Sequence, residues 1–160
     1  MDLIWALPLR DRATRFMSDK CFVDTNILVY AHDRSAGAKY LRARALVDRL
    51  WDSGGGALST QVLQELCYNL RRKVANSLPV EEVRLLLRDY ATWEVVTNTA
   101  ASILGALDIE TRYKTSFWDA LILHAAGACG ATILYSEDLA RGQLYGSIRV
   151  VNPLLNPVEC

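Results

Sequence analysis

The sequence is poor in the residues that bind zinc and other metals that prefer thiolate ligands. It has two histidines and four cysteines among 160 residues, and no two cysteines form a C-x-x-C pair. Structural zinc sites draw on four such ligands at close sequence spacing, so the sequence predicts no zinc site. Three of the four cysteines lie among apolar residues, as small buried side chains do, and we predict a protein of the reducing cytoplasm.

An excess of charge of one sign and long hydrophobic runs are also lacking. Eighteen basic residues balance eighteen acidic ones, whereas a dedicated duplex-DNA binder usually carries a basic excess. The most apolar long window, residues 117–135, contains Asp119, His124 and two glycines, so a membrane span here would bury a charge. We therefore predict no membrane segment. A nuclease remains open, because balanced totals can hide a basic rim around an acidic centre.

Short apolar strands and longer helical patterns alternate along most of the chain. Such alternation predicts an α/β domain with a central parallel sheet of four to five short strands and helices on both faces, a three-layer sandwich. Strands are expected over residues 21–24, 57–59, 93–96, 131–135 and 148–151. Helices are expected over residues 27–31, 37–53, 60–73, 79–90, 99–113 and 116–127.

The first residues have a different character. Pro8 and three arginines interrupt a weak apolar pattern, and Met17 stands just before the first strand. We therefore predict that residues 1–16 are an N-terminal extension or follow from an upstream start codon. The single compact domain is expected over residues 17–160.

Four acids are expected to meet at one edge of the predicted sheet. Asp24 ends the first strand, Asp138 follows the strand at 131–135, and Asp119 lies in the first turn of its helix. In a parallel sheet, the carboxyl ends of strands and the starts of the following helices share one edge. Glu65 lies five residues past Thr60, within about 8 Å of the same edge at the helical rise.

Each acid also has a purely structural explanation. Asp24 would form an Asx turn or cap the next helix, and Asp138 would cap a helix just after it. Asp119 would complete a Ser116-x-x-Asp119 capping box. Glu65 borders an apolar stripe, where a carboxylate gains nothing from capping and would otherwise be an exposed helix residue. The convergence of all four favours one shared site.

Clustered carboxylates repel one another, so a cation is expected at their centre. Oxygen ligands without histidine or thiolate suit Mg²⁺, with Mn²⁺ as a substitute, and such a site supports metal-assisted hydrolysis of a phosphodiester. The predicted catalytic and metal-binding residues are Asp24, Asp119, Glu65 and Asp138, the first two as principal ligands. The predicted supporting donors are Thr25, Asn26 and Ser136.

Other functional classes fit the residues less well. A phosphatase with an aspartyl nucleophile needs a second acid two positions after the first, where this chain has Asn26, and it needs a late lysine, whereas the last one here is Lys114. Gly54-Gly55-Gly56 lacks the Lys-Ser/Thr of a phosphate-binding loop. The run Arg71-Arg72-Lys73 is a candidate contact for RNA phosphates, with a solvated helix face as the alternative.

Four segments of the sequence, in this order and spacing, resemble the PIN domain family and most closely its VapC-type toxins. They are Phe22-Val23-Asp24-Thr25-Asn26-Ile27-Leu28-Val29-Tyr30, Leu58-Ser59-Thr60-Gln61-Val62-Leu63-Gln64-Glu65, Ser116-Phe117-Trp118-Asp119-Ala120-Leu121-Ile122 and Leu134-Tyr135-Ser136-Glu137-Asp138-Leu139. The resemblance runs from about residue 20 to residue 153. The extension before Met17 departs from the family pattern.

The resemblance maps the acidic quartet of the family onto Asp24, Glu65, Asp119 and Asp138, with Glu137 as the ambiguous neighbour of the last. It implies a Mg²⁺-dependent endoribonuclease that acts on structured RNA such as tRNA. It also implies a homodimer and a small VapB-like antitoxin that blocks the site. A PIN-like module that binds RNA or protein with negligible turnover is the alternative.

Overall fold

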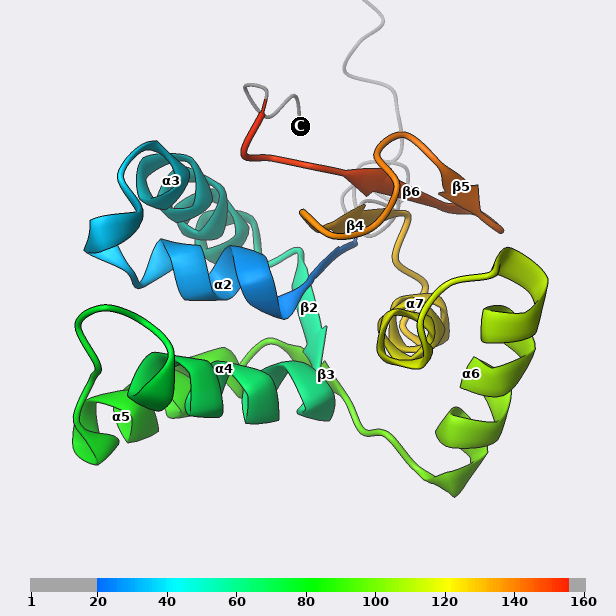
Figure 1. Cartoon of the computed structure of the whole chain (residues 1–160), viewed down its shortest axis with the longest axis horizontal. Coiled ribbons are helices and arrows are strands. Elements are labelled where there is room, and N and C mark those ends of the chain that lie inside the picture. Colours follow the sequence, from blue (N-terminus) through cyan, green and yellow to red (C-terminus); the bar gives the residue numbers. More distant parts are fainter. Residues whose placement is uncertain (1–19, 156–160) are drawn as a thin grey trace, which may run out of the picture.

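A six-stranded sheet lies at the centre of the computed structural model, which describes residues 20–155 (Figure 1). The predicted extension, residues 1–16, and Met17 lie outside the described residues. The strands are β1 Cys21–Val23, β2 Gly56–Ser59, β3 Glu94–Val96, β4 Ile133–Tyr135, β5 Leu144–Tyr145 and β6 Ile148–Val151. Their order across the sheet is β3-β2-β1-β4-β6-β5, and every neighbouring pair is parallel except β5 and β6.

Helices cover both faces of the sheet. Figure 1 shows α2 to α5 on one side, and α6 and α7 on the other. Their bounds are α2 Thr25–Ala31, α3 Ala38–Ser53, α4 Thr60–Arg72, α5 Val80–Tyr90, α6 Ala100–Tyr113 and α7 Phe117–Ala128, with a 3₁₀ turn, η2, at Arg34–Ala36. The predicted α/β class, the parallel sheet and the two helical layers are therefore confirmed. No helix in the described part of the chain is both long and apolar enough to cross a membrane.

Two local details differ from the sequence prediction. The two-residue strand β5, which turns back through Gly146 onto β6, was not predicted, because two residues are too short to show an alternating pattern. Helix α2 begins at Thr25 rather than at residue 27. It therefore starts directly after Asp24, so the strand and the helix are joined by that single residue.

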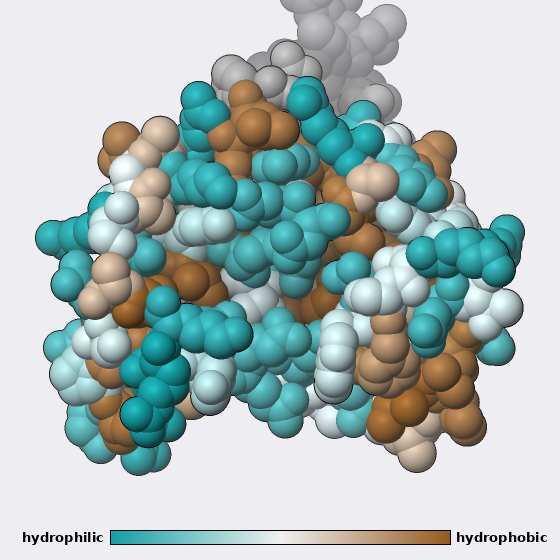
Figure 2. All heavy atoms as spheres, in the orientation of Figure 1, coloured by the Kyte–Doolittle hydropathy of each residue, from teal (hydrophilic) through white to brown (hydrophobic). Residues whose placement is uncertain are grey.

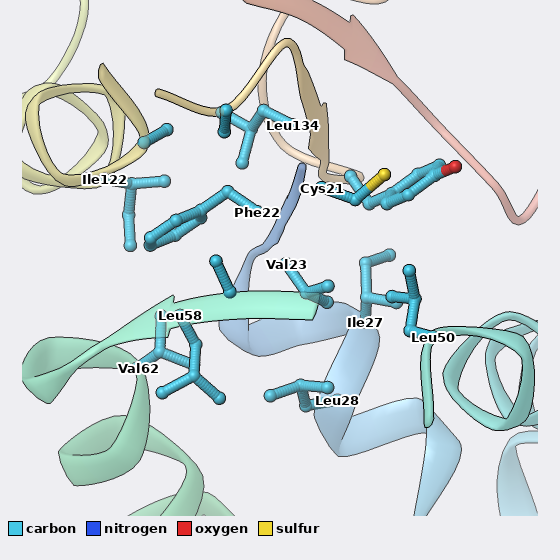
Figure 3. Close-up of a cluster of buried hydrophobic side chains, with 14 of the residues drawn as sticks. Cys21, Phe22, Val23, Ile27, Leu28, Leu50, Leu58, Val62, Ile122 and Leu134 are labelled. Carbon is cyan, nitrogen blue, oxygen red and sulfur yellow. The ribbon is translucent and has the colours of Figure 1, made fainter. Parts of the chain in front are cut away.

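The strand that carries Asp24 is buried on both of its faces, which is why it reads as a continuous apolar run. Cys21, Phe22 and Val23 are at most 5% exposed. In Figure 3, Phe22 points toward Ile122 of α7, whereas Val23 lies near Ile27 of α2. This alternation packs β1 against both helical layers and fixes the position of its carboxyl end.

The opposite end of the sheet is closed by an aromatic cluster. Trp93 lies 5.0 Å from Trp51 and 5.2 Å from Tyr90, measured between ring centroids. Gly56 opens β2 against the ring of Trp93, and a Cβ atom at this position would come within 2.5 Å of the ring. Glycine at position 56 therefore permits the close approach of β2 to the cluster.

Candidate active site

Asp24 occupies the junction between β1 and α2. Its backbone N–H donates to the carbonyl oxygen of Tyr135 at 2.9 Å, so the pairing of β1 with β4 continues up to this residue. Its Oδ1 accepts from the backbone N–H of Thr25 at 2.8 Å, which caps α2. Its Oδ2 accepts from the hydroxyl of Ser136 at 2.8 Å. Asp24 thus has the capping role that the sequence allowed, and its second oxygen contacts Ser136.

The surroundings of Asp24 disfavour its charge. Only 6% of the residue is exposed, and burial raises the pKa of its carboxyl group to about 7. The bonds from Ser136 and Thr25 lower this pKa, while the negative charges of Glu65 and Asp138 raise it further. Both of these carboxylates are therefore close enough to Asp24 to repel it.

Glu65 reaches the site from α4. The hydroxyl of Ser59, the last residue of β2, accepts from the backbone N–H of Val62 at 3.4 Å and so starts this helix. The Oε2 of Glu65 accepts from the hydroxyl of Thr25 at 2.7 Å, and its Oε1 accepts from the side-chain amide of Gln61 at 2.9 Å. Both carboxylate oxygens are therefore held by neighbouring side chains.

Asp138 follows β4 and faces the start of α2. Its Oδ2 accepts from the side-chain amide of Asn26 at 2.8 Å, and its backbone N–H donates to Ser136 at 3.2 Å. No helix begins after it, so the idea that Asp138 caps one is wrong. The neighbouring Glu137 instead forms an ion pair with Lys39, which favours Asp138 as the acid of the pocket.

Three acids thus gather around the first turn of α2. Asp24 caps that turn. Thr25, the next residue, donates a hydrogen bond to Glu65, and Asn26 donates one to Asp138. Figure 2 shows hydrophilic side chains gathered at the centre of the face in view, over the start of α2. The surface is hollowed below them, between the α4–α5 side and the α6 side.

Asp119 lies in the first turn of α7. Its backbone N–H donates to the hydroxyl of Ser116 at 3.1 Å, but the described hydrogen bonds include none from Ser116 to its carboxylate, so only half of the predicted capping box forms. The charge of Asp119 acts on Tyr145 of β5. It helps to raise the pKa of Tyr145, which burial raises most.

The donor chemistry of the site fits a hard cation, because Asp24, Glu65 and Asp138 offer carboxylate oxygens and the buried Asp24 carries the repulsion of two like charges. The positions of the acidic side chains fit a bound cation less well. Within residues 20–155, no three histidine, cysteine, aspartate or glutamate side chains lie close enough together to hold a metal ion. Asp24, Glu65 and Asp138 are instead held by hydrogen-bond donors.

Two further features lie on the helices that carry or hold the acids: the basic run of α4 and His32 at the end of α2. The basic run follows Glu65 along α4, and the ammonium of Lys73 lies 5.7 Å from the ring centroid of Tyr68. His32 ends α2, bonded to the hydroxyl of Tyr90 at 2.6 Å, and burial lowers its pKa to about 4. It serves the packing at the far end of α2.

One residue of the site was not predicted. Gln61 is 5% exposed and lies one helical turn before Glu65, with which it forms a hydrogen bond. Its spacing of four residues from Glu65 is the sequence signal that could have found it, since residues four apart share a helix face.

The mostly parallel sheet bears acids at its carboxyl edge. Residues 21–141 match the sequence model of the PIN domain, so this chain belongs to the PIN domain family. Two solved structures share its fold. VapC20 of Mycobacterium tuberculosis, described as a sarcin–ricin loop cleaving toxin, is 23% identical with a TM-score of 0.59, over 74% of this chain and 90% of its own. A toxin–antitoxin complex from Klebsiella pneumoniae is 17% identical with a TM-score of 0.60, over 84% and 98%. No protein with curated annotation matches the chain significantly.

Proposed function

We propose that this protein is a Mg²⁺- or Mn²⁺-dependent endoribonuclease that hydrolyses RNA phosphodiester bonds, and that it is the toxin of a toxin–antitoxin pair. The observation that carries the proposal is the gathering of Asp24, Glu65 and Asp138 around the first turn of α2. Membership of the PIN family and the fold shared with VapC20 support the same reading.

The cation would be held by Asp24 and Asp119 as principal ligands, with Glu65 and Asp138 completing the acidic pocket. When bound, it would polarise the phosphate and make an attacking water more acidic. Hydrogen bonds within the protein hold these ligand side chains in place before a cation binds. Ser136 and the start of α2 hold the two oxygens of Asp24.

Thr25 and Asn26 orient the two supporting acids from the same helical turn. These donors hold the carboxylates in position in the absence of the cation. Because a proton on Asp24 competes with the metal, and burial raises the pKa of Asp24 to about 7, metal affinity should increase as the pH rises through neutrality.

The partners of the protein follow from this function. RNA would lie in the hollow seen in Figure 2, with Arg71, Arg72 and Lys73 as phosphate contacts beyond Glu65 on α4. A structured RNA, such as tRNA, is the proposed substrate. A small VapB-like antitoxin would block the site, and the toxin would form a homodimer in the cytoplasm.

The test compares cleavage of tRNA and of a sarcin–ricin-type stem-loop RNA by wild type and Asp24→Asn, with Mn²⁺ present. We expect Asp24→Asn to cleave at least about 100-fold more slowly, because it replaces a buried ligand charge. The matched control is Asp52→Asn, which makes the same chemical change at an exposed position on α3. Equal cleavage by wild type and Asp24→Asn would contradict the assignment.

Within residues 20–155 no three acidic side chains lie close enough together to hold a metal ion, and this favours one alternative, a PIN-like module that binds RNA or protein with negligible turnover. Titration of Mn²⁺ and of RNA by calorimetry separates the two functions. RNA binding without cleavage at saturating Mn²⁺ would favour the binding module.

A further inference from the structure

Gln61 forms a bridge between two of the elements that carry acids. It lies in the first turn of α4 and is 5% exposed. Its side-chain amide donates to Oε1 of Glu65 at 2.9 Å and, more weakly, to the carbonyl oxygen of Trp118 at 3.4 Å. Trp118 precedes Asp119 in α7. One amide group therefore contacts the acid of α4 and the backbone beside the acid of α7.

The orientation of this amide follows from its neighbours. Both contacts are acceptors, so the NH₂ group must face them, and the reversed orientation would bring oxygen against oxygen. This leaves the Oε1 of Gln61 buried without a hydrogen-bond partner among residues 20–155. An unpaired buried acceptor destabilises the folded state, so the glutamine does not serve the stability of the fold well.

The bridge determines how Glu65 is held. Thr25 fixes one carboxylate oxygen, and Gln61 fixes the other. Without Gln61 the carboxylate could rotate about its bond to Thr25, and the first turn of α7 would lose its polar link to α4. Groups that orient metal ligands in this way typically change metal affinity or activity by about 10–100-fold when they are removed.

We propose that Gln61 is a positioning residue that sets the orientation of Glu65 relative to the start of α7, and thereby sets the affinity of the site for a divalent cation. This inference rests on the proposed function, because it assigns Gln61 a role in the same metal site. Gln61 itself contacts neither substrate nor cation.

The test measures Mn²⁺ affinity by isothermal titration calorimetry on the full chain, without RNA. Gln61→Met keeps the length of the side chain and removes the amide. We expect its dissociation constant for Mn²⁺ to rise by about 10–100-fold. Its melting temperature should stay within about 4 °C of wild type, because the unpaired acceptor is removed together with the donor.

Two comparisons make the test specific. Gln64→Met makes the same chemical change at an exposed position on the same helix, and it should leave Mn²⁺ affinity unchanged. In a Glu65→Gln background, Gln61→Met should weaken Mn²⁺ binding by less than about twofold, since its effect acts through Glu65. An equal loss with and without the Glu65 carboxylate would overturn the inference.

The remaining outcomes are also decisive. If wild type and Gln61→Met bind Mn²⁺ equally well, this inference alone is wrong. If wild type binds no Mn²⁺, the proposed function is wrong and the inference falls with it. Should Gln61→Met fail to fold, Gln61→Asn provides the same comparison, because its amide is one methylene too short to reach Glu65.

Discussion

Replacing Asp24 by asparagine should stabilise the metal-free protein at neutral and alkaline pH. An aspartate in an unfolded chain has a pKa near 4, whereas burial raises the pKa of Asp24 to about 7 in the folded protein. Between these values the unfolded chain has released the proton that the folded chain keeps. Stability therefore falls as the pH rises from about 4 to about 7, and the loss is complete above pH 7.

The size of the effect follows from the same values. A difference of about three units between the folded and unfolded pKa of Asp24 corresponds to about 4 kcal/mol of unfolding free energy. Asp24→Asn would recover this free energy above pH 7. The variant also loses the hydrogen bond that Ser136 donates, at a cost of about 1 kcal/mol. We therefore expect a net gain of about 3 kcal/mol at pH 8, or roughly 6–12 °C in melting temperature. At pH 4 the variant should be less stable than wild type by about 1 kcal/mol.

The assay is thermal and denaturant unfolding of wild type and Asp24→Asn at pH 4, 6 and 8, with a chelator present. Asp52→Asn controls for the loss of an exposed acid and should show no such pH dependence. A difference between Asp24→Asn and wild type that stays constant from pH 4 to pH 8 would refute the argument. So would destabilisation of the variant at pH 8.

Two further substitutions follow from the contacts. Asn26→Ala should weaken Mn²⁺ binding about tenfold in calorimetry, because Asp138 loses its hydrogen-bond donor. Glu137→Gln should change Mn²⁺ affinity less than about twofold, because Glu137 pairs with Lys39 instead. Equal losses would contradict the choice of Asp138 over Glu137 as the acid of the pocket. Gly56→Ala should lower the unfolding free energy by about 1–3 kcal/mol in denaturant titrations, because its Cβ would meet the ring of Trp93, and a loss below about 0.5 kcal/mol would contradict that packing.

Much of the fold was predictable because it depends on local patterns. A buried strand between two helical layers reads as a run such as Cys21-Phe22-Val23, and the amphipathic helices show their period directly. The parallel topology then places Asp24 and Asp138 at the ends of neighbouring strands without any knowledge of side chains. The match to the PIN family covers residues 21–141, a range that includes the four segments that resemble it.

The contacts between the acids could not be predicted from those patterns. Thr25 meets Glu65 across 40 residues, and Asn26 meets Asp138 across 112, so each bond depends on strand register and helix position together. Topology alone grouped Asp119 with the other acids. The structure brings no three acidic side chains of residues 20–155 close enough together to hold a metal ion, because an edge shared by strands and helices does not fix how far apart its members lie.

The amino-acid sequence by itself determined that an acid ends the first buried strand, and it predicted that three more acids belong to the same side of an α/β domain. Local hydrophobic period and chain order are enough for that. Only the tertiary structure decided that the first turn of α2 holds Glu65 and Asp138, that Gln61 holds the second oxygen of Glu65, and that Asp24 is buried enough for its pKa to rise to about 7. Those properties depend on side-chain contacts and desolvation, which exist only once the helices have packed against the sheet.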